Sequence, residues 1–172
     1  EQFSSNNGGV KQSENYARIV NSKHFERLKS LLDRTTSFGD KVYMGGQTDS
    51  SSDFIEPTVL TDVKSESPIM SEEIFGPILP IITYNEIDEV IRLINSSPKP
   101  LGLYIFSYNR KNIDFILNNT SAGGTSINDT ILHYMHLNLP FGGINNSGFG
   151  RTHGEAGFKA FSNQRSILRQ SR

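Results

Sequence analysis

The pattern of apolar and polar residues predicts one long helix early in the chain, followed by short extended segments. From residue 14 to residue 32, "ENYARIVNSKHFERLKSLL", apolar side chains recur at three- and four-residue spacing, which is typical of an amphipathic helix that packs on a sheet. "KVYMGG" predicts a short strand closed by glycines. "FIEPTVLTDV" predicts an extended segment in which Pro57 favours an edge or irregular strand.

The second half of the chain alternates between strand and helix patterns. The order is strand, helix, strand, helix, strand, in "PILPIITY", "NEIDEVIRLINSS" with Asn85 as N-cap, "PLGLYIFSYN", "RKNIDFILNNT" and "GGTSIN". A βαβαβ run of this kind predicts parallel strands, right-handed crossovers and flanking helices, so the expected fold class is α/β. No repeat or linker divides the chain, and we expect residues 1–172 to form one segment of a domain.

From Leu139 onward the chain is too rich in glycine for regular elements until a short helix after Gly154. Such loops carry function more often than cores do, because glycine lets the backbone approach a ligand closely. The last stretch, "SNQRSILRQSR", has the pattern of a strand with no partner within this sequence.

Composition narrows the classes of function. The 35% hydrophobic and 20% charged content is that of a globular chain. A net charge of -1 without a basic stripe argues against nucleic acid and anionic lipid as partners. No apolar run approaches the roughly 20 residues of a membrane span. There is no cysteine, which excludes disulfides, Cys-ligated zinc and thiolate catalysis by this chain's own residues.

Two adjacent carboxylates, Glu72 and Glu73, precede an apolar strand in "SEEIFGPILPIITY". Read structurally, they open a helical turn whose N-terminal dipole favours negative charge. The functional interpretation starts from the rigid Gly-Pro turn that follows a glutamate, an apolar residue and an aromatic residue. Such a turn would fix a carboxylate and a ring at the mouth of a cleft. A carboxylate held there can accept two hydrogen bonds from a vicinal diol such as that of a ribose.

Other candidate motifs are weaker. The glycines of "GFGRTHG" have the wrong spacing for a dinucleotide fingerprint, and no strand leads into them. Neither a P-loop nor a Gly-x-Ser-x-Gly elbow is present. His133 and His136 in "HYMH" offer two metal ligands without a third, so a structural or solvent-exposed pair is favoured and no metal site is expected.

Several motifs in order resemble the aldehyde dehydrogenase superfamily. "EEIFGPILPI" is similar to its signature, and "NDTILHYMHLNLPFGGINNSGFGRTHGEAGFKAFSNQRSIL" resembles its C-terminal part. The resemblance is to the class 3 and fatty-aldehyde-dehydrogenase-like branch. It extends through "YARIVNSKHFERLKSLL" and "FIEPTVLTDV" and so covers essentially the whole chain.

The resemblance implies a role for the acidic motif in binding the cofactor, NAD or NADP. Glu73 would bind the nicotinamide ribose hydroxyls, and Phe75 would pack beside the nicotinamide end. Glu72 has no role by resemblance and is expected to be solvated.

The resemblance also implies a substrate side of the site. Phe141, in "PFGG", would line the aldehyde tunnel, and Gly142 and Gly143 would let the backbone pass close to the substrate entrance. Asn128 would stand near the catalytic centre in a supporting role.

The family's reaction requires a cysteine thiolate, an asparagine that holds the oxyanion, hydride transfer to nicotinamide and a glutamate-activated water. Because this chain lacks the cysteine and the Rossmann segment, we expect it to be the C-terminal part of a catalytic domain, inactive alone. Its expected partners are a small-molecule aldehyde, the remaining N-terminal part of the same protein and further copies in a homo-oligomer. Residues from about 160 to 172 are a candidate oligomerisation tail, and a cytoplasmic location is expected.

Two alternatives remain open. One is a stand-alone, non-catalytic binding or interaction module with the same fold, which predicts a start codon just upstream of Glu1. Truncation predicts instead a reading frame that continues upstream through a cysteine codon. The other alternative is a related reductase that acts on acyl phosphates, although "EEIFGP" and "PFGG" fit it less well.

Overall fold

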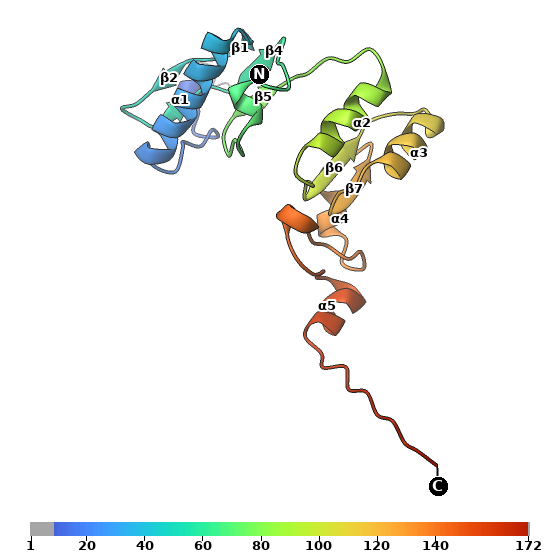
Figure 1. The fold of residues 1–172 in the computed structure, drawn as a ribbon. Coiled ribbons are helices and arrows are strands. Elements are labelled where there is room, and N and C mark those ends of the chain that lie inside the picture. The colour runs from blue at the N-terminus through green and yellow to red at the C-terminus, as the bar shows by residue number, and fades with distance from the viewer. Residues whose placement is uncertain (1–8, 172) are drawn as a thin grey trace. The chain divides into compact units, whose positions relative to one another are not determined.

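The computed structural model describes residues 9–171 and confirms the α/β fold class (Figure 1). The chain forms two compact units, divided between Thr83 and Tyr84. The expectation that residues 1–172 act as one segment of a catalytic domain stays a prediction.

The first unit is built around one long helix and a small mixed sheet. Its elements, with η marking 3-10 helices, are η1 (Val10–Gln12), α1 (Ser22–Phe38), β1 (Lys41–Met44), β2 (Thr48–Asp49), β3 (Phe54–Ile55), β4 (Thr58–Thr61), η2 (Pro68–Met70) and β5 (Ile78–Pro80). The sheet order is β1-β4-β5, with β4 antiparallel to β1 and parallel to β5. Strands β2 and β3 form a separate antiparallel hairpin.

Helix α1 begins later than its hydrophobic pattern predicts. The side chain of Asn21 accepts a hydrogen bond from the backbone N–H of His24 at 3.0 Å and so caps the first turn. Residues 13–21 are not helical, and the backbone N–H of Ile19 donates instead to the carbonyl of Asp53 at 3.0 Å. The predicted start at residue 14 is therefore wrong, whereas the amphipathic helix itself is confirmed.

The core of the first unit lies between α1 and the sheet. Strand β4 alternates buried and half-buried side chains, which is the pattern of a strand covered on one face. Its Leu60 and the helix residues Leu28 and Leu31 are completely buried. The core cluster consists of Phe25, Leu28, Leu31, Leu32, Ile55, Leu60, Val63, Ile69 and Ile78.

Strand β5 has a different partner from the one its sequence order predicts. The backbone N–H of Thr58 donates to the carbonyl of Pro77 at 2.8 Å, and that of Ile81 donates to the carbonyl of Leu60 at 2.9 Å. These bonds align β5 with β4 rather than with β6, so the predicted run of three consecutive parallel strands holds only for its last two members.

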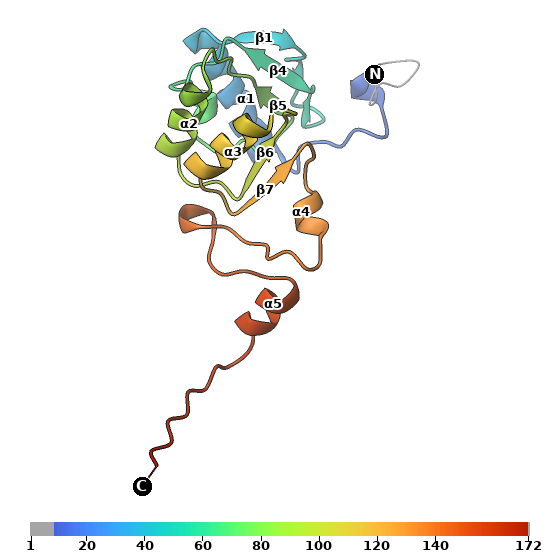
Figure 2. The ribbon, with the colours of Figure 1, turned by 90° about the vertical axis from the view of Figure 1, so that its right-hand side faces the viewer.

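The second unit contains a parallel βαβ motif followed by long loops. Its elements are α2 (Ile87–Ser96), β6 (Gly102–Ile105), α3 (Arg110–Asn119), β7 (Gly124–Ile127), α4 (Leu132–Met135), η3 (Asn145–Ser147) and α5 (Gly154–Ala160). Strands β6 and β7 pair in parallel, and α2 and α3 pack against each other beside them (Figures 1 and 2).

The two helices that pack beside β6 and β7 begin differently. Asn109 caps α3 by accepting from two backbone N–H groups. Helix α2 has Glu86 rather than the predicted Asn85 at its N-cap position, and no side chain caps it.

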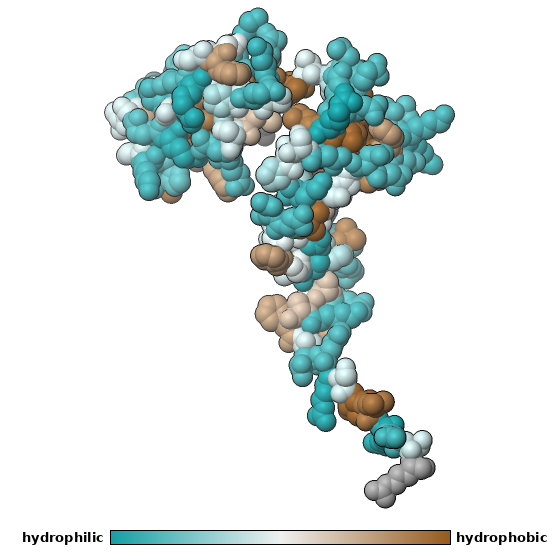
Figure 3. Space-filling model, in the orientation of Figure 1, coloured by the Kyte–Doolittle hydropathy of each residue, from teal (hydrophilic) through white to brown (hydrophobic). Residues whose placement is uncertain are grey.

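The second unit buries few apolar side chains. Ile91 and Ile105 are its buried hydrophobic residues among those described, whereas Phe149, Phe161 and Leu168 are more than 90% exposed. Within residues 163–171 the structure has neither helix nor strand, so the strand pattern at the end of the sequence is not realised there. Figure 3 shows hydrophobic surface on this C-terminal tail. In the described part of the chain, no helix has both the length and the apolar character needed to cross a bilayer.

Truncating the centre of β4 should destabilise the first unit. We expect Leu60→Ala to lower the free energy of unfolding by about 2–5 kcal/mol, because Leu60 is completely buried between α1 and the sheet. The matched control is Leu79→Ala on β5, whose side chain is 58% exposed and which should change stability by less than about 1 kcal/mol. Urea unfolding followed by circular dichroism measures both, and equal effects of the two variants would contradict this core.

Candidate functional site

One arginine of α1 holds the acidic loop that follows η2. The guanidinium of Arg27 donates to Glu72 Oε2 at 2.9 Å, to the carbonyl of Glu73 at 3.3 Å and to the carbonyl of Ile74 at 2.6 Å. Charge-assisted bonds of this kind are stronger than neutral ones. Three consecutive residues of the loop are thereby fixed to the helix.

Glu72 takes a structural role rather than the solvated one expected for it. Its second oxygen, Oε1, accepts from Arg34 at 3.0 Å, so the carboxylate bridges two arginines that lie about two helical turns apart. The hydrogen bond from Arg27 is the main cause that lowers the pKa of Glu72, and Arg34 adds to it. Residues 71–77 are not helical, so the interpretation of the acidic pair as the opening of a helical turn is wrong.

Glu73 differs from its neighbour in having a free side chain. It is exposed, and within residues 9–171 no group contacts its carboxylate through a hydrogen bond or ion pair. Phe75, two residues on, is 77% exposed and has a φ of 45°, an uncommon conformation for an aromatic residue. Strained backbone of this kind is concentrated at functional sites.

The ring of Phe75 lies at a shallow hollow of the first unit. The hollow has a volume of about 430 Å³ and is lined by Arg18, Ile19, Val20, His24 and Phe75. The loop therefore presents a free carboxylate and a hollow with a ring at its edge.

Gly76 fits the loop closely onto α1. A Cβ atom at this position would lie 2.6 Å from Cδ1 of Leu28, whose side chain is completely buried. Since Leu28 cannot move aside without disturbing the core, the glycine is required by close approach.

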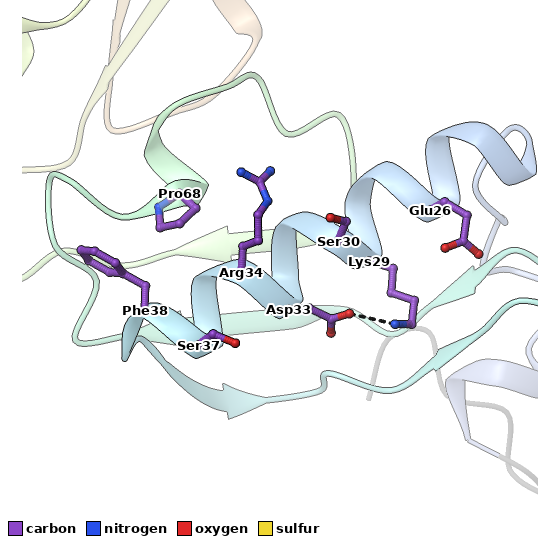
Figure 4. A pocket seen from close by; sticks show the side chains of 8 residues that line it. All are labelled: Glu26, Lys29, Ser30, Asp33, Arg34, Ser37, Phe38 and Pro68. Carbon is purple, nitrogen blue, oxygen red and sulfur yellow. Dashed lines mark hydrogen bonds and ion pairs between the residues drawn. The ribbon is translucent and has the colours of Figure 1, made fainter.

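A second hollow lies on the outer face of α1 (Figure 4). It has a volume of about 560 Å³ and is lined by Glu26, Lys29, Ser30, Asp33, Arg34, Ser37, Phe38 and Pro68. Its central charges neutralise each other, because Lys29 Nζ lies 2.8 Å from Asp33 Oδ2. We assign no binding role to this face.

Both polar atoms of the Asn128 side-chain amide form hydrogen bonds with one residue of the second unit, Ser107. Its Oδ1 accepts from the backbone N–H of Ser107 at 2.8 Å, and its Nδ2 donates to the carbonyl of the same residue at 2.9 Å. With a φ of 57°, Asn128 thus extends the pairing of β6 and β7 beyond their ends. A supporting role near the catalytic centre stays a prediction.

Phe141 lies in a cluster of aromatic rings. Its centroid is 4.9 Å from that of Tyr134, 5.9 Å from that of His133 and 5.8 Å from that of His153. The backbone of Phe141 also exchanges two hydrogen bonds with Thr152. The half-buried ring therefore has a fixed position, and its place in an aldehyde tunnel stays a prediction.

Gly142 and Gly143 are required by the packing of their own loop. A Cβ atom at Gly142 would lie 2.4 Å from the carbonyl oxygen of Gly150, and one at Gly143 would lie 2.0 Å from that of Ser147. Arg151 donates to the carbonyl of Gly143 at 2.5 Å and secures the same crossing. The expected approach of this backbone to a substrate is untested.

The two histidines of "HYMH" have separate partners. His133 Nδ1 lies 3.0 Å from Ser126 Oγ, and His136 Nδ1 accepts from the backbone N–H of Asn138 at 3.4 Å. Within residues 9–171, no group of three histidine, aspartate or glutamate side chains is arranged to hold a metal ion.

The predicted site residues fall into two sets. Glu73 and Phe75 share one loop of the first unit, and Asn128, Phe141 and the two glycines belong to the second unit. Sequence reasoning missed Arg27 and Arg34, because no local pattern shows that helix residues contact a loop 38 or more positions away.

The Glu72 carboxylate should give the first unit an acid-dependent stability. Its folded-state pKa is lowered below the ordinary 4.5, so its contribution is fully present above that pH and is lost as the pH falls through the folded value. We expect Glu72→Gln to be less stable than the wild type at pH 7 and to differ less from it as the pH falls below about 4.5. Thermal melts at several pH values measure this.

The control for this prediction is Glu73→Gln. The carboxylate of Glu73 has no partner in the described part of the chain, so this variant should melt like the wild type at pH 7. A constant difference between Glu72→Gln and the wild type across the acid range would contradict the linkage.

Comparison with known proteins places these features in a family. The model of the aldehyde dehydrogenase family matches residues 4–167. The chain is 49% identical over 159 residues to aldehyde dehydrogenase family 3 member A2 of Rattus norvegicus, with 92% of this chain and 32% of that protein aligned. It is 48% identical over 162 residues to the dimeric NADP-preferring aldehyde dehydrogenase of the same organism, with 94% of this chain and 35% of that protein aligned.

A solved structure agrees in fold. The substrate-bound state of Staphylococcus aureus AldH superposes with a TM-score of 0.84 at 44% identity, covering 96% of this chain and 36% of that one. The chain thus spans about a third of the length of these relatives. The family match over nearly the whole sequence, together with these relatives, shows that this chain belongs to the aldehyde dehydrogenase family.

Proposed function

We propose that this chain is the C-terminal part of an aldehyde dehydrogenase subunit that oxidises aldehydes to carboxylic acids with NAD or NADP. The family match, the coverage of about a third of each relative and the absence of cysteine support this proposal. The nucleophilic cysteine would then come from residues that precede this stretch. One rat relative is named for preferring NADP and for being dimeric, which supports a pyridine nucleotide and a homo-oligomer here.

The single observation that carries the cofactor assignment is the contrast between two adjacent carboxylates. Glu72 is occupied by Arg27 and Arg34, whereas Glu73 is exposed on a fixed backbone and has no partner within residues 9–171. A carboxylate with all its lone pairs free can accept both hydroxyls of a ribose diol. The nearby exposed ring of Phe75 suits a flat apolar group.

The chain's own residues would bind and orient rather than react. When bound, the nicotinamide cofactor supplies a hydride acceptor for the oxidation. Glu73 would hold the ribose, and Phe75 would limit the positions open to the ring next to it. Phe141, fixed by its aromatic neighbours, would offer an apolar wall to the substrate. Medium-chain, long-chain or aromatic aldehydes suit a wall of that kind.

The isolated chain should be inactive. We expect no NAD-dependent or NADP-dependent oxidation of hexanal by residues 1–172, because the chain has no cysteine to attack the carbonyl. Its affinity for NAD should be on the order of millimolar at best, since one loop supplies few of the contacts that offset the cost of association. Calorimetric titration tests this, and micromolar binding would contradict the proposal.

In the full-length subunit, Glu73 should matter for cofactor binding. We expect Glu73→Gln to raise KM for NAD or NADP by about tenfold, because the amide keeps one acceptor oxygen and loses the charge. The matched control is Glu26→Gln, an exposed position on α1 outside the loop, which should leave KM unchanged. Steady-state kinetics with varied cofactor measure both, and an unchanged KM in Glu73→Gln would refute the cofactor assignment.

A further inference from the structure

We propose that Arg27 is a positioning residue for the cofactor-binding loop, setting where Glu73 presents its carboxylate. This inference rests on the proposed function of Glu73. Arg27 itself is directed at the loop backbone and at Glu72, and no step of the chemistry is assigned to it.

Arg27 contacts the side chain of Glu72, which precedes Glu73, and the two backbone carbonyls that follow the Glu73 Cα. One nitrogen, Nη1, reaches Glu72 Oε2 and the carbonyl of Glu73, while Nη2 reaches the carbonyl of Ile74 at 2.6 Å. A planar guanidinium can direct donors at separate acceptors in this way, whereas an ammonium acts as a single point charge. The orientation of the two peptide planes that follow the Glu73 Cα therefore depends on one side chain.

The packing of the core determines where Arg27 meets the loop. Its neighbours along α1, Phe25 and Leu28, are 1% and 0% exposed, so the helix backbone that carries Arg27 is held by close packing. Leu28 also contacts the loop at Gly76, where even a Cβ atom would not fit. Residues 72–76 are thus fixed at one end by a charge-assisted fork and at the other by van der Waals contact.

Glu73 depends on this frame because its side chain has no support of its own. Within residues 9–171 its carboxylate makes neither a hydrogen bond nor an ion pair, and only its backbone carbonyl is held. Without Arg27 the carbonyls of residues 73 and 74 would turn to water, and the loop would sample more conformations. Binding a diol would then have to offset the cost of ordering the loop again.

Arg34 provides a matched control on the same helix. It donates to Glu72 Oε1 at 3.0 Å and, among the described residues, it makes no hydrogen bond to the loop backbone. Arg34→Ala removes the same type of side chain and one partner of the same carboxylate, but it leaves the contacts to residues 73 and 74 in place.

The test uses the full-length subunit with NAD varied and hexanal fixed. We expect Arg27→Ala to raise KM for NAD by about tenfold with a smaller change in kcat, and Arg27→Lys to lie between it and the wild type. Added guanidinium chloride, below the concentration that unfolds the protein, should lower KM in Arg27→Ala and leave KM in Arg34→Ala unchanged. A purely structural role would not produce such rescue.

The outcomes separate this inference from the proposed function. If Glu73→Gln raises KM for NAD while Arg27→Ala matches Arg34→Ala, the positioning role is refuted and the cofactor assignment stands. If Glu73→Gln has the wild-type KM, the cofactor assignment itself fails. A lower melting temperature in Arg27→Ala with unchanged KM also refutes positioning. Should Arg27→Ala not fold, Arg27→Lys decides the question by the same readouts.

Discussion

The packing of α1 on β4 is the constraint on which the first unit depends. Leu28, Leu31 and Leu60 are completely buried between them, and this contact fixes the line along which Arg27 and Arg34 emerge from the helix. The loop after η2 then takes its position from those arginines and from Leu28. Hydrophobic packing is not directional, but it positions the helix that carries Arg27. The guanidinium of Arg27 then orients individual carbonyl groups of the loop through directional hydrogen bonds.

The second unit is held together by contacts of a different kind. It buries few apolar side chains in its described part, and its long loop is shaped by close backbone crossings at Gly142 and Gly143 and by the rings around Phe141. Large exposed hydrophobic side chains such as Phe149 and Phe161 remain on its surface. Apolar surface of this extent is typical of segments that are covered by other parts of an assembly.

Local patterns in the sequence predict most of the elements but not their partners. The amphipathic face of α1 and the β6-α3-β7 motif follow from periodicity, because the burial of one face imposes a period of 3.6 or 2. The start of α1 does not, since Tyr16 and Ile19 fit the helical spacing, while the N–H of Tyr16 closes a turn with Ser13 and that of Ile19 bonds to Asp53. The pairing of β5 with β4 likewise depends on backbone bonds between distant residues.

In the candidate site, too, the sequence predicts individual residues but not their distant partners. The motif "EEIFGP" identifies Glu73 and Phe75 through resemblance, and the close approach of Leu28 explains its glycine. The sequence has no signal for the pairing of Glu72 with Arg27, which lies 45 positions earlier, because an ion pair across that distance exists only after the core has formed. Nor does any spacing place His153 against Phe141.

The pairing of Glu72 explains why two carboxylates stand next to each other. A lone carboxylate beside Arg27 would be drawn to the guanidinium and would have fewer lone pairs left for a diol. Glu72 forms ion pairs with both Arg27 and Arg34, so its negative charge partly compensates their positive charges. Arg27 still has N–H donors left for the carbonyls of the loop. Glu73 can then keep an exposed carboxylate, unpaired within residues 9–171, on a backbone that Arg27 holds by hydrogen bonds. The first glutamate holds the loop in place, and the second is the carboxylate that the proposed function assigns to the ribose.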